Sequence, residues 1–195
     1  MISNENNKLL SVKGIIASMT NDCNNILLAE IITSNMLNNL NTKEIIALIS
    51  IFANPSKIDN DDELSHYKSI NLNMKYEIIV DIISKYNKQE SESKLYIDEE
   101  YWNITNRYID ITMDWLNIQY DSPTFMQERA FVLVKLTEMG EYEGNFVKNM
   151  LKIYNIICNI KVICNILKLY DLLQKLEEAD KLILKDIVNV NSLYL

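Results

Sequence analysis

The sequence predicts an all-α protein, a compact bundle of about seven helices. Apolar residues recur three or four positions apart along most of the chain, which is the spacing that places side chains on one side of a helix. Only 3 glycines and 2 prolines are present, so the residues that tight hairpins and phosphate-binding loops require are scarce. With 195 residues, of which 48% are hydrophobic, the chain is long enough to bury one core without disulfides or metal.

The chain is expected to hold one folded domain behind a short lead. Residues 1–11 are polar and rich in asparagine, which is typical of a flexible terminus. Residues 12–195 then form the helical bundle. Within them, residues 12–17 predict a short extended segment before the first helix, and no internal repeat of solenoid period is present.

Capping residues predict the first two helices. Asn21 or Asp22 is expected to cap a helix that continues to Leu37. Asn41 and Glu44, three residues apart, form a capping-box pattern at the start of the second helix, because each side chain can bond to the backbone of the other.

Breaker and charge-rich segments divide the middle of the chain. The Asn54-Pro55 pair ends the second helix, because a proline pushes the residue before it out of the helical region. The acidic residues 56–65 and the QESESK segment at 89–94 are expected to be exposed loops. Between them, apolar residues at every fourth position predict a third helix over about 66–88.

Two further helices are expected before the last quarter of the chain. The acidic residues that begin at Asp98 favour a helix start there, because carboxylates are stabilised at the positive end of the helix dipole. Ser122 and Pro123 are expected to be the cap and the first residue of the next helix, which continues to about Glu138. Gly140 then ends it.

The last quarter, residues 143–195, holds the longest helical pattern. Apolar residues line one side of that helix, and a narrower polar stripe lies opposite. The polar residues are Asn145, Lys148, Asn149, Lys152, Asn155 and Asn159. Two more helical patterns, at 167–176 and 182–190, continue to the C-terminus.

The net charge of −8 argues against a general polyanion-binding protein, since nonspecific nucleic-acid affinity comes mostly from phosphate neutralisation by Lys and Arg. Any RNA contact must therefore be local, on a basic stripe such as that of Lys148 and Lys152, or be shared with another chain or domain. Ammonium and amide groups one turn apart donate to phosphate, ribose and base edges without requiring a sequence. An ordinary solvated helix face would have the same pattern.

Motifs for catalysis are absent from the sequence. It has no GxxxxGK[ST] loop, no GxGxxG and no nucleophile elbow, so no catalytic residue, metal ligand or cofactor is assigned to this chain. Asp62, Glu63 and His66 are similar to an Asp-Glu-x-His box, but the spacing has one residue too many. Trp102 and Trp115 could stack on bases, although filling a core is the more ordinary role of a tryptophan on a helix.

The cysteines and the N-terminus favour an intracellular protein. Cys23, Cys158 and Cys164 are odd in number and lack CxxC spacing, which argues for thiols in a reducing compartment rather than disulfides or zinc. The N-terminus has no signal-peptide pattern, and no stretch is judged apolar enough to approach a transmembrane span. We therefore expect a soluble protein of the nucleus or cytoplasm with no membrane partner.

The chain ends in KDIVNVNSLYL, and its longest helical pattern begins with EGNFVKNMLKIYN. These segments resemble the closing (K/R)DIV..(A/P)SLYL and the EGxxIRxxxRLEE helix of the C-terminal helical domain, often called DSHCT, of the Ski-like DExH RNA helicases. VKGIIASMTNDCNNILLAEIITSNMLNNLNTKEIIALISIF resembles the start of that domain, and KLYIDEEYWNITNRYIDITMDW resembles its middle. The resemblance covers residues 12–195, and the stretch between Trp115 and Glu143 is several residues longer than the family pattern.

The resemblance implies a role in RNA translocation. In that family the domain packs against two RecA-like motor domains, and its ratchet helix touches single-stranded RNA that is drawn 3′ to 5′. By motif position the ratchet helix is residues 144–159, with the arginines of the family pattern falling on Lys148 and Lys152 and a glutamate on Asn155. The RNA-binding residues implied are Lys148, Lys152, Asn155 and Asn159. ATP and Mg are expected on motor domains that this chain lacks.

Two hypotheses follow, from different functional classes. The first is a noncatalytic module of a helicase that acts in RNA unwinding and decay, with an exosome-type complex as a further partner. The second is an interaction or scaffold bundle that has kept the fold and does not bind RNA. Dependence on motor domains separates the two hypotheses.

Overall fold

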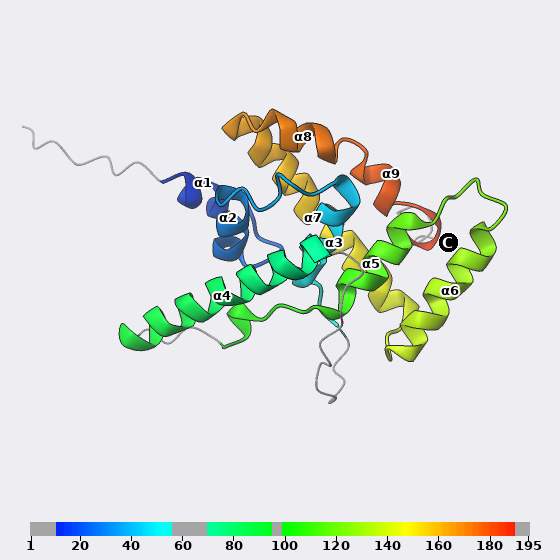
Figure 1. Cartoon of the computed structure of the whole chain (residues 1–195), viewed down its shortest axis with the longest axis horizontal. Coiled ribbons are helices and arrows are strands. Elements are labelled where there is room, and N and C mark those ends of the chain that lie inside the picture. The colour runs from blue at the N-terminus through cyan, green and yellow to red at the C-terminus, as the bar shows by residue number, and fades with distance from the viewer. Residues whose placement is uncertain (1–10, 56–69, 95–98, 190–195) are drawn as a thin grey trace, which may run out of the picture.

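The structure is a computed structural model that describes residues 11–55, 70–94 and 99–189. In this part of the chain every regular element is a helix, which confirms the predicted all-α class (Figure 1). The expected flexible lead, apart from Ser11, the expected acidic loop and the closing SLYL lie outside the described residues.

The described part of the chain contains α-helices and short 3-10 turns and no strand. The 3-10 turns are labelled η. The elements are α1 (Val12–Ser18), α2 (Asn25–Thr33), α3 (Thr42–Ile49), η1 (Ser50–Phe52), α4 (Ile70–Glu92), η2 (Glu99–Trp102), α5 (Arg107–Asn117), α6 (Phe125–Glu138), α7 (Glu143–Leu167), α8 (Tyr170–Leu176), α9 (Ala179–Ile183) and η3 (Asp186–Val188). The third predicted helix corresponds to α4, which continues four residues past its expected end at Lys88.

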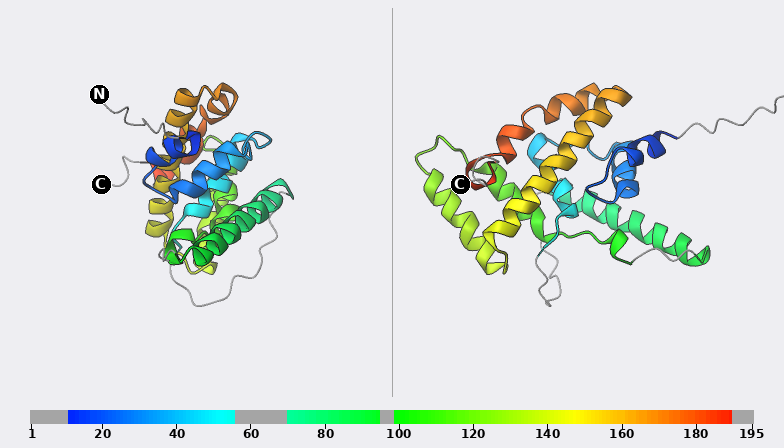
Figure 2. Two further views of the ribbon diagram at one scale, coloured as in Figure 1. Left: turned by 90° about the vertical axis from the view of Figure 1, so that its left-hand side faces the viewer. Right: turned by 180° about the vertical axis from the view of Figure 1, so that it is seen from behind.

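Helix α7 is at the centre of the contacts in the bundle. It contacts α3, η1, α6, α8, α9 and η3, whereas the long helix α4 packs on α2 and α3. Seen from behind, α7 crosses the near side of the molecule and no other helix is drawn over it (Figure 2). One side of α7 therefore belongs to the core and the other side to the surface.

The core is built around aromatic residues of α5 and α7. Trp115, Tyr108 and Phe146 are among the largest fully buried side chains. The Phe146 ring stacks on Tyr108 with centroids 6.5 Å apart and meets Trp115 edge-on at 5.5 Å. Trp102 is also buried and stacks on Tyr86 at 4.9 Å. Both tryptophans are therefore core residues rather than exposed stacking platforms for bases.

The segment over residues 12–17 is helical, so the expected extended conformation is wrong. The hydroxyl of Ser11 accepts a hydrogen bond from the backbone N–H of Gly14 at 3.1 Å and caps α1. This cap satisfies a backbone donor that a helix start leaves unpaired. Helix α1 then packs on α2.

Helix α2 is capped by Asn24, so the caps expected at Asn21 or Asp22 are wrong. The Asn24 side chain accepts from the backbone N–H of Leu27 at 2.9 Å, and its amide donates to a carbonyl of η2 at 2.8 Å. Because of this bond to η2, which is distant in sequence, Asn24 is the cap rather than Asn21 or Asp22. The helix also ends at Thr33, before the predicted Leu37.

The capping box predicted at the start of α3 is confirmed. The backbone N–H of Glu44 donates to the Asn41 side chain at 3.0 Å, and the backbone N–H of Asn41 donates to the Glu44 carboxylate at 2.9 Å. Both bonds are local, which is why the sequence pattern alone was sufficient to predict them.

The helix predicted from Asp98 is interrupted. A 3-10 turn, η2, comes first, and α5 begins only at Arg107. Between them, the backbone N–H of Thr105 donates to the carbonyl of Ile51 in η1 at 2.9 Å. At this point a backbone N–H therefore bonds to a distant segment instead of to a carbonyl of its own helix.

Both ends of α6 depend on local backbone geometry. The expected start at Ser122 and Pro123 is two residues too early, because the Ser122 hydroxyl accepts from the backbone N–H of Thr124 at 3.1 Å in a turn before the helix. At the other end Gly140 has a φ of 69°. This left-handed conformation, which glycine adopts without strain, ends the helix as predicted.

Helix α7 is long and apolar enough to cross a membrane by length and composition, so the expectation that no stretch approaches a span is wrong. This test is weak evidence, because the core helix of a folded domain also passes it. In the bundle, α7 turns a row of apolar side chains to the core. They include Phe146, Met150, Ile153, Ile156, Ile157, Ile160 and Ile163.

The KDIV motif, residues 185–188, connects the segment after α9 to α5 and α6. Lys185 is buried, donates from Nζ to the carbonyl of Ile118 at 2.7 Å, and lies 5.6 Å from the centre of the Trp115 ring. Asp186 pairs with Arg129 of α6. The segment predicted to be helical at 182–190 is only partly so. Helix α9 ends at Ile183, and the 3-10 turn η3 begins at Asp186.

The buried amine of Lys185 should make stability depend on pH. Burial, reinforced by Lys43, lowers the pKa of Lys185 from its ordinary value of 10.5 to about 8. Between these two values the unfolded chain binds more protons at this group, so the contribution of Lys185 to the free energy of unfolding rises with pH. Wild type should therefore gain stability relative to a Lys185→Met variant as the pH rises through 8, measured by urea unfolding.

A Lys185→Arg variant is the control for this prediction, because arginine stays charged throughout that range. The free energy of unfolding of wild type should also rise relative to that of Lys185→Arg as the pH rises through 8. Stability curves that run parallel for wild type and Lys185→Met across the range would contradict the prediction.

A candidate nucleic-acid interface on helix α7

The four residues proposed from the sequence share one stripe of α7, but they differ in exposure. Lys148 and Asn155 are exposed, whereas Lys152 and Asn159 are partly buried. The steps of four, three and four residues between them keep these side chains on one side of a helix. Lys148 has no partner among the described residues. The stripe thus combines one solvent-facing cation with a second cation in a more enclosed place.

Two asparagines that the sequence pattern placed on the same stripe face inward instead. Asn149 is buried, and its side chain brackets the backbone of Asn54: its Oδ1 accepts from the Asn54 N–H at 2.8 Å, and its Nδ2 donates to the Asn54 carbonyl at 2.9 Å. Asn145 donates to the same carbonyl at 3.3 Å. The polar stripe is therefore narrower than predicted, because these amides attach α7 to the segment after η1.

The same amides belong to a polar network at the start of α7. Asn149 also donates to the hydroxyl of Tyr108 at 2.8 Å, and Asn145 donates to the buried carboxylate of Glu141 at 2.7 Å. Burial raises the pKa of Tyr108, so its hydroxyl stays neutral. Polar groups in such a position must be paired, and here the pairs connect α5, α7 and Asn54.

Lys152 reaches from α7 toward two other segments. Its Nζ donates to Oδ1 of Asn54 at 3.1 Å. Burial lowers the pKa of the Lys152 ammonium, while the neighbouring Cys23 and Asp22 act in the opposite direction. Burial also raises the pKa of Cys23 to about 12, so its thiol is neutral and Asp22 is the anion near this lysine.

The outer face of α7 changes character along its length. Beyond Asn159 the same stripe continues through Val162 and Ile166, which are 51% and 53% exposed. Two apolar side chains therefore follow the polar ones on the surface of the helix. A ligand running along α7 would meet ammonium and amide groups first and hydrocarbon afterwards.

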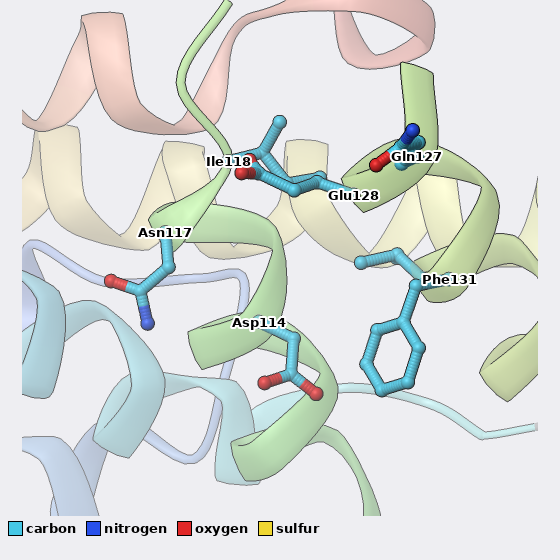
Figure 3. Close-up of a pocket in the computed structure, with 7 residues that line it drawn as sticks. Asp114, Asn117, Ile118, Gln127, Glu128 and Phe131 are labelled. Carbon is cyan, nitrogen blue, oxygen red and sulfur yellow. The ribbon is translucent and has the colours of Figure 1, made fainter. Parts of the chain in front are cut away.

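A second surface feature lies on α6. Met126, Phe131 and Val134 are large apolar side chains that are all more than half exposed on this helix. Phe131 also borders a hollow of about 380 Å³ between α5 and α6 (Figure 3). An exposed apolar surface of this kind is typical of a site that another protein covers.

The two carboxylates that line the hollow have hydrogen-bond partners. Asp114 accepts from Lys135 at 2.7 Å, and Glu128 accepts from the hydroxyl of Thr124 at 2.8 Å. Figure 3 shows both carboxylates at its border. Among the described residues, no group of three or more His, Cys, Asp or Glu side chains could hold a metal ion.

Sequence reasoning missed the bonds that connect Asn54, Tyr108 and Asn149 beside the candidate interface. The one available signal was the Asn54-Pro55 pair, which predicted the end of a helix but not the bonding partner of the asparagine. Of the cysteines, Cys164 is buried, whereas Cys23 and Cys158 are partly buried. None of the three is paired in a disulfide.

A protein-family model matches most of the chain. The family model of the DSHCT (NUC185) domain matches residues 7–191 of the chain, which is nearly its whole length. No curated protein matches it. The matched range contains α7, the stripe with Lys148, and the KDIV motif.

Replacing Asn149 by Ala should destabilise the fold. The substitution removes the amide that bonds the Tyr108 hydroxyl and the backbone N–H of Asn54, while Asn145 still donates to the Asn54 carbonyl. A buried group left unpaired costs about 1–3 kcal/mol. Because Asn54 is itself exposed and water can replace part of the loss, we expect a total of about 1–3 kcal/mol in urea unfolding.

Asn155→Ala on the same helix is the matched control for this prediction. Asn155 is exposed, and surface substitutions of this kind change stability by less than about 0.5 kcal/mol. Equal stability of the two variants would show that the bonds of Asn149 with Asn54 contribute nothing.

Proposed function

The chain belongs to the DSHCT (NUC185) domain family, the C-terminal domain of Ski2-like helicases, and from that membership we propose that it is a noncatalytic part of an RNA helicase. In this proposal it packs on RecA-like motor domains and contacts single-stranded RNA through α7 while the motors draw the strand 3′ to 5′. The observation that carries it is the exposed stripe of α7, on a helix whose opposite face is buried in the core.

The chemistry of the stripe supports contact with a nucleic-acid strand. Lys148 offers an ammonium to solvent, and Asn155, seven residues on, offers an amide. These groups donate to phosphate and ribose oxygens, and an amide also pairs with base edges, without selecting one sequence. A helix held by its core face presents them in a fixed row, which suits a strand that moves past.

The net charge of −8 is consistent with a contact that is local and shared with the motor domains. ATP and Mg belong to those motor domains in this proposal. The proposal also places the protein inside the cell, in the nucleus or cytoplasm and without a membrane partner, in RNA decay with an exosome-type complex.

The apolar surface of α6 supports the protein–protein part of the proposal. Met126, Phe131 and Val134 are exposed on it, and aromatic and methionine side chains are common in protein interfaces. The same surface favours the second candidate function, an interaction bundle that binds a protein partner and no RNA. Both candidates require a partner, so RNA-dependent activity is the property that distinguishes them.

The decisive experiment is complementation. A Ski2-like helicase from which the C-terminal domain has been removed should regain RNA-stimulated ATP turnover when this chain is added. The assay follows phosphate release with and without single-stranded RNA. Binding of the chain to the truncated helicase without stimulation would support the interaction bundle and reject the RNA-helicase role.

Substitution of Lys148 should separate RNA binding from folding. Lys148→Ala should weaken RNA binding by the complemented helicase, because it removes an exposed cation from the stripe, while the melting temperature stays close to that of wild type. Lys181→Ala is the control, since Lys181 is an exposed lysine on α9 rather than on α7. If the two variants bind RNA equally well, Lys148 is not an RNA contact.

A further inference from the structure

The hollow between α5 and α6 has an apolar border that the described residues leave uncovered. Ile118 and Val132, which are buried, and Phe131, which is 59% exposed, line it together (Figure 3). Its volume of about 380 Å³ lies in the range of protein sites that hold a ligand. The two carboxylates that line it accept hydrogen bonds from Lys135 and Thr124. The surface that the hollow offers to an occupant is therefore mainly hydrocarbon.

The last described residues lie beside this hollow. Nζ of Lys185 donates to the carbonyl of Ile118, which lines the hollow, at 2.7 Å. Asp186 pairs with Arg129 of α6, and the backbone N–H of Asn189 donates back to the carbonyl of Asp186 at 3.0 Å. Figures 1 and 2 show the red end of the described chain beside α5. The residues that follow Asn189 therefore start next to the two helices that form the hollow.

Residues 190–195 have the composition and the length to fill it. They read Val-Asn-Ser-Leu-Tyr-Leu, with large apolar side chains in succession at Leu193, Tyr194 and Leu195 and no charged side chain. An extended stretch of six residues spans at most about 20 Å, several times the length of the lysine side chain that already reaches Ile118. Removing side chains of this kind from water is favourable wherever an apolar surface lies within reach.

The bonds of the KDIV motif direct this segment to α5 and α6. The exposed apolar residues Met74 and Ile78 belong instead to α4, which packs on α2 and α3. A segment without charged side chains also suits the hollow, because burying an unpaired charge would be costly and the carboxylates already there are hydrogen-bonded.

We propose that residues 190–195 dock in the hollow between α5 and α6 and cover Phe131 with the apolar side chains of Leu193, Tyr194 and Leu195. The occupant of the hollow is then a segment of this chain rather than another molecule. Met126 and Val134 do not line the hollow, so they stay exposed on α6 for a protein partner. This inference goes beyond the proposed function and does not depend on RNA binding.

A double-mutant cycle in the full chain tests the docking. Phe131→Ser should raise the equilibrium constant for unfolding by about tenfold, because it removes apolar surface that the segment covers. Val134→Ser is the matched control: Val134 is 56% exposed on the same helix but does not line the hollow. It should change that constant by about twofold or less.

The second half of the cycle replaces Leu193, Tyr194 and Leu195 together by Ser. In this background Phe131→Ser should have the same small effect as Val134→Ser, because nothing is left to cover the ring. Urea unfolding of the four chains measures the coupling. An effect of Phe131→Ser that is equal in the two backgrounds would overturn the inference.

Disulfide trapping identifies the occupant. A chain that carries both Phe131→Cys and Leu193→Cys should form a bridge within one chain on mild oxidation, at a rate independent of protein concentration. The control chain carries Ile78→Cys with Leu193→Cys and should form no such bridge, because Ile78 is exposed on α4. Non-reducing electrophoresis and mass mapping of the bridged peptides give the result.

The remaining outcomes each overturn the inference. A bridge that forms only between two chains would assign the hollow to a second copy. If a separate protein partner covers the hollow, Phe131→Ser and Val134→Ser should both leave stability nearly unchanged and both weaken binding of the chain to the truncated helicase. None of these results bears on RNA-stimulated ATP turnover in the complementation experiment, so the proposed function is tested separately.

Discussion

The burial of one face of α7 is the constraint on which the rest of the structure depends. The helix contacts α3, α6, α8, α9 and the turns η1 and η3, and Phe146 lies against the rings of both Trp115 and Tyr108. A helix is a rigid cylinder of side chains, so fixing one face in the core also fixes which residues point to solvent. The exposure of Lys148 and Asn155 is therefore a consequence of how the core packs.

The polar bonds at the start of α7 place a second demand on the fold. A buried amide costs free energy unless it is paired, and Asn149 is paired with both the backbone of Asn54 and the hydroxyl of Tyr108. These bonds connect the end of η1 with α5 and α7, three elements that are far apart in the chain. They also hold Asn54 where its side chain meets Lys152. A structural requirement of the core thus shapes the surface beside it.

The motifs that are most specific for the family serve the fold as much as the proposed function. In the KDIV motif, Lys185 bonds to the carbonyl of Ile118 and Asp186 pairs with Arg129, so both charges are used inside the bundle. The stretch that is longer than the family pattern contains α6, whose exposed apolar residues include Phe131. The polar stripe of α7 and the exposed apolar residues of α6 therefore lie on different helices of one bundle.

The sequence by itself determined the helical class, the family and those helix ends that depend on neighbours in the chain. The Asn41 and Glu44 box and the stop at Gly140 were predictable because their bonds and backbone angles are local. Only the tertiary structure decided which polar residues turn inward. Asn149 and Lys148 are adjacent and both polar, but Asn149 bonds to Asn54, 95 residues away, and to the hydroxyl of Tyr108. Asn24 likewise caps α2 while bonding to η2, 77 residues away, and no local pattern contains that contact.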